Sequence, residues 1–112
     1  MLLTREQILK AQDIATKDVP VPEWGGTVRV RQLTLAERDE MVRRGRTDGN
    51  KHLTAWLLSI LIVDDSGNPV FKPEDIEELN KRNPKVADRV ADEILSLSKL
   101  TEETVKEAEK NS

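Results

Sequence analysis

The apolar segment from Leu53 to Val63 constrains the fold of this chain more than any other feature. Nine of its eleven residues are apolar, although charged residues make up 35% of the chain. The large apolar residues recur at the spacing of one α-helical stripe, formed by Leu53, Trp56, Leu57, Ile60 and Leu61. Leu58 and Ile62 lie beside this stripe and widen it. A helix that is apolar nearly all round is either central to a core or shared with a partner, and the function of the chain depends on which of these holds.

The composition of the chain argues against several classes of function. A formal net charge of −3 and a pI near 5.3 argue against a dedicated nucleic-acid-binding protein, in which a basic stripe usually dominates the charge. Cysteine and tyrosine are absent and there is one histidine, so we expect neither an enzyme nor a bound cofactor. The absence of cysteine also suits a reducing cytoplasm.

Neither a membrane span nor a secretory signal is expected. The apolar run of eleven residues is shorter than the roughly 20 residues that a transmembrane helix needs. Charged residues occur within the first six positions, where a signal peptide would lead into its apolar core. The sequence therefore predicts a soluble intracellular protein without membrane contacts.

The chain of 112 residues is expected to form a single domain over residues 1–112, because this length supports one modest core. The predicted fold class is mainly α, a small α+β fold with an N-terminal β-hairpin. Periodicity places an N-terminal helix at about 4–16, the hairpin at about 19–33 and a helical bundle at about 34–110. The bundle is expected to contain about four to five helices packed in layers.

Capping signals mark the starts of the predicted helices. Thr4 with Gln7, and Thr34 with Glu37, have the spacing of a capping box, in which each member accepts a hydrogen bond from the backbone of the other. The longest amphipathic pattern follows Pro84, a residue that suits the first turn of a helix.

The hairpin is expected to close with a four-residue loop, Trp24 to Thr27. A two-residue Gly25-Gly26 loop is the usual interpretation of such a pair, but it would put Pro22, which has no N–H, opposite Arg29 at a hydrogen-bonded position. The longer loop turns the prolines outward and gathers the valines on one face. Its hydrogen-bonded pairs would be Glu23–Val28, Val21–Val30 and Val19–Gln32.

The residues that are capable of catalysis or metal binding do not form the pattern of a catalytic or metal site. His52 has no second histidine or cysteine to act with, so an exposed surface position is expected. Asp64, Ser66 and Asn68 have calcium-loop spacing, but Pro69 stands where that loop needs glycine. A plain turn explains these residues without a metal.

Trp24 lies at the hairpin tip beside two glycines. An exposed tryptophan there would be a candidate anchor for a partner protein. It could equally fold back over Val28 and the adjacent helix, and the sequence leaves both alternatives open.

Several segments, in this order and spacing, resemble tail assembly chaperones of long-tailed bacteriophages and related prophages. The resemblance covers most of the chain and is carried by residues 19–31, 33–38, 63–71, 73–79 and 97–103. It implies a non-enzymatic protein that binds the tape-measure protein, keeps it soluble and helps to recruit tail tube subunits. It also implies location in the cytoplasm of the bacterial host, absence from the mature virion, and a match to the short form that such families make.

The resemblance and the apolar helix together suggest a protein-interaction surface. A groove formed by wide-striped helices could hold a helical client, and head-to-tail self-association would give closed rings or open spirals. The candidate contact residues are Trp24, Trp56, Leu57, Leu58, Leu61 and Ile62.

The alternative function is a small helical regulatory or nucleic-acid-associated protein. It would use a face of arginines, which must then lie together in the fold: Arg29, Arg31, Arg43, Arg44 and Arg46. Steep loss of DNA affinity with rising salt would favour this alternative.

Overall fold

The structure is a computed structural model that describes residues 1–47 and 52–98. Its sheet is antiparallel, with three strands in the order β1-β2-β3. The strands are β1 (Thr16–Val21), β2 (Gly26–Arg31) and β3 (Ile62–Val63). Strands β1 and β2 form the predicted hairpin, and β3 adds to the other edge of β2.

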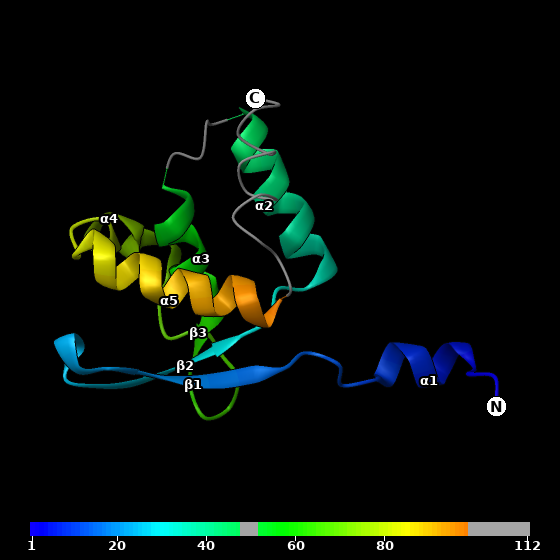
Figure 1. Cartoon of the computed structure of the whole chain (residues 1–112). Coiled ribbons are helices and arrows are strands. Elements are labelled where there is room, and N and C mark those ends of the chain that lie inside the picture. The colour runs from blue at the N-terminus through cyan, green and yellow to red at the C-terminus, as the bar shows by residue number, and fades with distance from the viewer. Residues whose placement is uncertain (48–51, 99–112) are drawn as a thin grey trace.

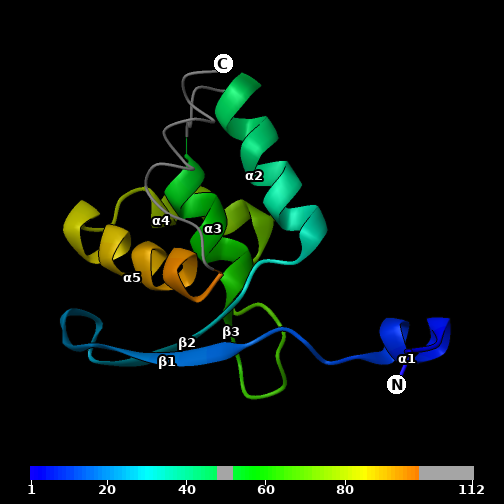
Figure 2. The ribbon, with the colours of Figure 1, turned by 45° about the vertical axis from the view of Figure 1, so that its right-hand side comes forward.

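Helices cover one face of this sheet (Figures 1 and 2). Helix α5 (Pro84–Leu97) packs on β1 and β2, and α3 (Leu53–Leu61) packs on α5. Helices α4 (Ile76–Leu79) and α2 (Leu35–Thr47) both pack beside α3. Helix α1 (Arg5–Lys10) projects from the body of the molecule in both views. The predicted fold class, a small α+β fold with an N-terminal helix, a hairpin and then helices, is confirmed.

Helix α3 lies at the centre of the core. Leu58 and Leu61 expose 1% and 0% of their surface, and even Ser59 is buried, with its hydroxyl donating to the Trp56 carbonyl at 2.7 Å. Helix α5 covers α3 with the apolar face that its sequence predicts, formed by Val86, Ala87, Val90, Ala91, Ile94 and Leu95. The apolar segment therefore lies within the core, and among the residues of α3 only Thr54 and Ile60 are partly exposed.

Local capping bonds form as the sequence predicts. The Thr4 hydroxyl accepts the Gln7 N–H at 3.2 Å, and Gln7 Oε1 accepts the Thr4 N–H at 2.9 Å. Thr34 and Glu37 make the same reciprocal pair at the start of α2. Asn83 caps α5 by accepting from the backbone at its first turn.

The hairpin confirms the predicted valine face and corrects the predicted register. Val19 pairs with Val28 and Val21 with Gly26, whereas the sequence predicted Val21 opposite Val30. The true register is displaced by an even number of residues, so each side chain keeps the face it was assigned. Val19, Val21 and Val30 are accordingly buried.

The physical reason for the shift lies in the turn. Pro22 starts a 3₁₀ turn, η1 (Pro22–Trp24), and Gly25 follows with φ of +83°, in the left-handed region that glycine adopts without steric cost. The loop therefore has the predicted length of four residues but occupies residues 22–25 rather than Trp24 to Thr27.

The N-terminal helix is shorter than predicted. It was expected at about 4–16 but ends at Lys10, and none of its residues is buried. Gln32 donates its backbone N–H to the Ala15 carbonyl at 2.9 Å and accepts the Ala15 N–H on Oε1 at 3.1 Å. The chain is therefore held in extended form where the helical pattern alone would continue.

The segment after α3 also departs from the predicted bundle at about 34–110. Residues 62 and 63 leave the helix to form β3, and a bridge joins Val63 to Pro69 across the turn. The Asp64 carboxylate accepts the backbone N–H groups of Ser66 and Asn68, so the expected plain turn is present. The part of the bundle predicted beyond residue 98 lies outside the described residues.

Candidate protein-binding site

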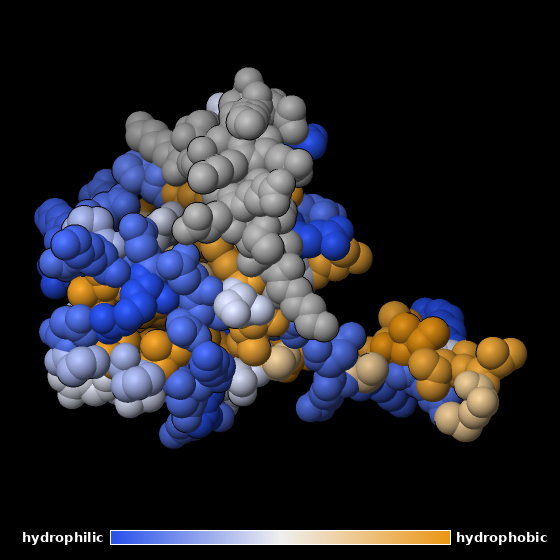
Figure 3. Space-filling view, viewed as in Figure 1, coloured by the Kyte–Doolittle hydropathy of each residue, from blue (hydrophilic) through white to orange (hydrophobic). Residues whose placement is uncertain are grey.

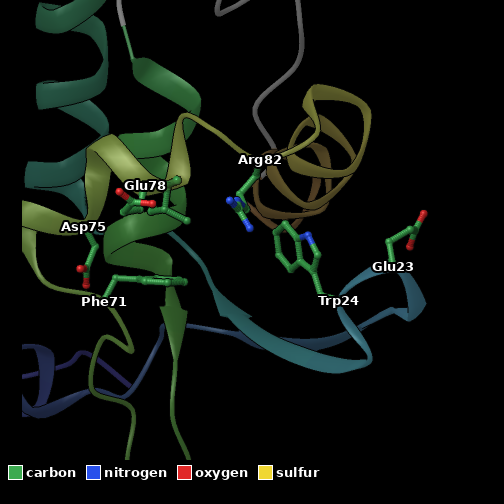
Figure 4. A pocket seen from close by; sticks show the side chains of 7 residues that line it. Glu23, Trp24, Phe71, Asp75, Glu78 and Arg82 are labelled. Atoms are coloured by element: carbon green, nitrogen blue, oxygen red, sulfur yellow. The ribbon is translucent and has the colours of Figure 1, made fainter.

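A groove of about 620 Å³ opens between the hairpin turn and α4 (Figure 4). Its apolar lining comes from three separate segments, with Trp24, Phe71 and Leu79 as the contributing residues. Trp24 rises from the hairpin turn, and Phe71 points into the groove from the opposite side. Polar side chains complete the lining: Glu23, Asp75, Glu78 and Arg82. The volume falls within the range of about 300–1,000 Å³ that is typical of ligand pockets.

The 3₁₀ turn η1 places Trp24 at this groove. The Gly25 N–H donates to the Pro22 carbonyl at 3.0 Å, which closes the turn. The indole is half-buried and packs against the edge of the core. The sequence left open whether this ring is exposed or folds back, and the structure gives it one face on the core and one face in the groove.

An ion pair fixes the hairpin turn to α5. Arg89 donates through both terminal nitrogens to the two carboxylate oxygens of Glu23, each at 2.8 Å. The guanidinium hydrogen bonds lower the pKa of Glu23 from 4.5 to about 2. A bidentate pair of this kind orients the turn as well as attracting it, so Glu23 holds the neighbouring Trp24 in position.

Acid should loosen this attachment. Because the folded-state pKa of Glu23 is below its unfolded value, its stabilising contribution is present above about pH 4.5 and is lost as the pH falls towards about 2. We expect the melting temperature, followed by circular dichroism, to fall less over this interval in Glu23→Gln than in the native chain. Glu74→Gln, at an exposed carboxyl, is the matched control and should keep the native pH dependence. Equal slopes for all three proteins would contradict this role of Glu23.

The opposite wall of the groove is set by a second 3₁₀ turn, η2 (Pro73–Asp75), and by α4. Asp75 accepts the Lys72 N–H at 2.8 Å, which fixes the entry into α4. Leu79 is buried where α4 packs on α3. After α4, the Asn80 amide lies 2.7 Å from His52 Nδ1. His52 is exposed, as the sequence predicted.

The structure separates the predicted contact residues into two groups. Trp24 lines the groove. The other five lie in the core, with exposed fractions of 7% or less: Trp56, Leu57, Leu58, Leu61 and Ile62. They present no open surface in this conformation, and their contact with a partner stays a prediction.

Sequence reasoning missed two further apolar surfaces. One is the groove, because nothing local in the sequence indicated that tertiary packing would bring Phe71 and Leu79 beside Trp24. The second surface is the N-terminal segment, where apolar side chains expose between 40% and 95% of their area: Leu2, Leu3, Ile8, Leu9 and Ile14.

The arginines of the alternative function mostly serve ion pairs within the fold. Their carboxylate partners lie at 2.6–3.0 Å in the pairs Arg29–Asp18, Arg31–Glu37, Arg43–Glu40 and Arg44–Glu40. Arg44 also stacks over the Trp56 ring, 4.7 Å from its centroid. These carboxylates offset the positive field that a nucleic-acid surface requires.

Two further kinds of feature, a metal site and a membrane-spanning helix, are not found among the described residues. Within residues 1–47 and 52–98, no three histidine, cysteine, aspartate or glutamate side chains are grouped so that they could hold a metal ion. Over the same ranges, no helix combines the length and apolarity required to cross a membrane.

The fold and the groove together define a small α+β protein with an open groove lined by both apolar and charged side chains. The family model described as phage tail assembly chaperone matches residues 4–111. The chain therefore belongs to the phage tail assembly chaperone family, and it is a chaperone and not an enzyme.

A solved structure supports the same fold. The chain is similar to the structure of the bacteriophage HK97 tail assembly chaperone, with a TM-score of 0.63 and 23% sequence identity. The similarity covers 82% of this chain and 90% of that chain. A search of curated protein sequences finds no significant match.

Proposed function

We propose that this tail assembly chaperone binds apolar helical segments of the tape-measure protein in the groove between the hairpin turn and α4. The observation that carries the proposal is the convergence of Trp24, Phe71 and Leu79 on one open groove. An amphipathic client helix can lay its apolar face into such a groove. Tryptophan is one of the residue types enriched among energetically dominant interface contacts.

In this proposal, the buried residues beneath the groove have a structural role. Helix α3 packs on α4 and carries four of the predicted contact residues, Trp56, Leu57, Leu58 and Leu61, with Ile62 directly after it. They hold the groove walls in place while Trp24 meets the client. Binding would keep the tape-measure protein soluble and leave it available for tail tube subunits in the host cytoplasm. The chaperone would then be released before the virion is complete.

The test is co-expression with the tape-measure protein of the same phage or prophage. We expect the soluble fraction of the tape-measure protein to rise and the two proteins to copurify. Fragments of the tape-measure protein titrated into the purified chaperone by calorimetry should identify the bound segments. Failure of every fragment to bind, with no gain in solubility on co-expression, would contradict the proposed function.

A further inference from the structure

Most of the charged side chains that line the groove are available to a partner. Glu23 is the exception, because it is committed to the bidentate ion pair with α5. Within the part of the chain that the structure describes, no ion pair is found for Asp75 or Arg82. Glu78 pairs with Lys81 at 3.1 Å, but both side chains are largely exposed. Exposed pairs of this kind contribute little, so Glu78 can exchange Lys81 for a partner's cation.

The two signs of charge occupy different parts of the groove. Asp75 and Glu78 are three residues apart where η2 continues into α4, so their side chains lie on the same side of this segment. Figure 4 shows both carboxylates on the same side of the groove as Phe71, and the Arg82 side chain pointing toward Trp24. The groove therefore has an acidic wall, formed by Asp75 and Glu78, and a separate basic side chain beside the indole.

The N-terminal segment is a second apolar surface that is open to a client. Ile8 and Leu9 expose 57% and 67% of their surface, and Figure 3 shows the apolar side chains of this segment projecting from the body of the molecule. Arg5 and Glu6, in the first turn of its helix, pair with each other at 3.7 Å. Apolar surface attracts any apolar segment, whereas fixed charges penalise a partner that carries the wrong charge. Selection among apolar segments is therefore expected of the groove.

We propose that the acidic wall and Arg82 select, among the apolar helical segments of the client, those that carry a basic and an acidic residue beside the apolar face. This inference rests on the proposed function, because it uses the same groove and the same client. A lysine or arginine of the client meets Asp75 and Glu78. An aspartate or glutamate of the client meets Arg82, whose guanidinium can hold a carboxylate through two parallel hydrogen bonds. The aromatic rings and Leu79 attract apolar segments in general, and the charges decide which of them binds.

Charge reversal at the acidic wall tests this selection with a matched control on the same helix. Glu78→Lys changes a residue that lines the groove, whereas Glu77→Lys makes the same change at an adjacent exposed residue outside the lining. For a tape-measure segment that binds the native chain, we expect Glu78→Lys to weaken binding about five-fold at low salt. Glu77→Lys should weaken it by less than about two-fold. The difference should nearly vanish in about 1 M salt, where the screening length is about 3 Å. Calorimetric titration at both salt concentrations measures these affinities.

Exchange of charge across the interface identifies the contacts. Each basic residue beside the apolar face of the bound segment is replaced in turn by glutamate. One of these replacements should weaken binding to the native chain and restore binding to Glu78→Lys, because it recreates a pair of opposite charges. Arg82→Glu should be rescued in the same way when one acidic residue of the segment is replaced by lysine. Its control is Lys85→Glu, at an exposed residue outside the groove lining.

Three results would overturn the inference: equal effects of Glu78→Lys and Glu77→Lys, a loss at Glu78 that persists at high salt, or the absence of any restoring replacement. All four substituted residues are exposed, so circular dichroism should show a native fold in each variant. Trp24→Ala separates the two proposals. If this variant loses affinity while every charge variant binds as the native chain does, the groove binds the client without selecting charge. If no segment binds the native chain, both proposals are wrong.

Discussion

Replacement of Leu61 by alanine is expected to lower the free energy of unfolding by about 2–5 kcal/mol, the usual cost of truncating a fully buried leucine. Leu61 exposes 0% of its surface in the core around α3. Truncation there removes contacts with helices and sheet at once and leaves a cavity. Since the total stability of a domain is typically about 5–15 kcal/mol, this single change should remove a large share of it. Denaturant unfolding followed by circular dichroism measures the effect.

Leu9→Ala is the matched control for this change, because the residue type is the same and the side chain is 67% exposed. At a concentration where the chain is monomeric, it should alter the free energy of unfolding by less than about 0.5 kcal/mol. Similar losses at Leu9 and Leu61 would show that α1 is packed in the monomer. A small loss at Leu61 would show that the face of α3 containing it is open.

Replacement of Trp24 by alanine is expected to weaken binding of a tape-measure segment by about 30-fold, which corresponds to about 2 kcal/mol. The indole supplies one wall of the groove, and its truncation would remove apolar contact area that no neighbouring side chain replaces. Calorimetric titration of the variant with a fragment that binds the native chain measures the loss.

Two controls show whether a loss of affinity is specific to the groove. Leu35→Ala removes an exposed apolar side chain away from the groove and should leave the affinity unchanged. Circular dichroism of Trp24→Ala should show native helix content, because the indole is only half-buried. An affinity loss shared by Leu35→Ala would point to general adhesion to apolar surface, and unchanged affinity of a folded Trp24→Ala would place the client elsewhere.

Elements set by local chemistry were predictable from the sequence. The capping boxes at Thr4 and Thr34 form because their partners lie three residues away in the chain. Helix α5 begins at Pro84 and buries the expected face, since its apolar spacing is regular over its whole length. Neither feature depends on which distant segments pack nearby.

The prediction of the hairpin register failed for a specific reason. The predicted and observed pairings differ by an even number of residues, so both bury the valines, and the hydrophobic pattern cannot separate them. The register is determined by the turn, because Pro22 starts a 3₁₀ turn and Gly25 ends it at positive φ. The Gly25-Gly26 pair instead favoured a loop centred on these two glycines.

The candidate site was harder to predict because it is a product of tertiary structure. Trp24 could be singled out, since a tryptophan beside two glycines is conspicuous. Phe71 and Leu79 belong to other segments, and only the packing of α4 on α3 brings them to the same groove. Periodicity likewise identified the apolar character of α3 but could not determine that its residues are all buried except Thr54 and Ile60, which are half-buried.

Fluorine NMR of the chain labelled with 5-fluorotryptophan tests the central claim most directly, because the two tryptophans, Trp24 and Trp56, report on the groove and on the core respectively. Single substitutions to phenylalanine assign the two resonances. On titration with a binding tape-measure segment, we expect the Trp24 resonance to shift and the Trp56 resonance to stay in place. A shift of the Trp56 resonance with Trp24 unchanged would contradict the account, since it would show that the client reaches the apolar helix and bypasses the groove.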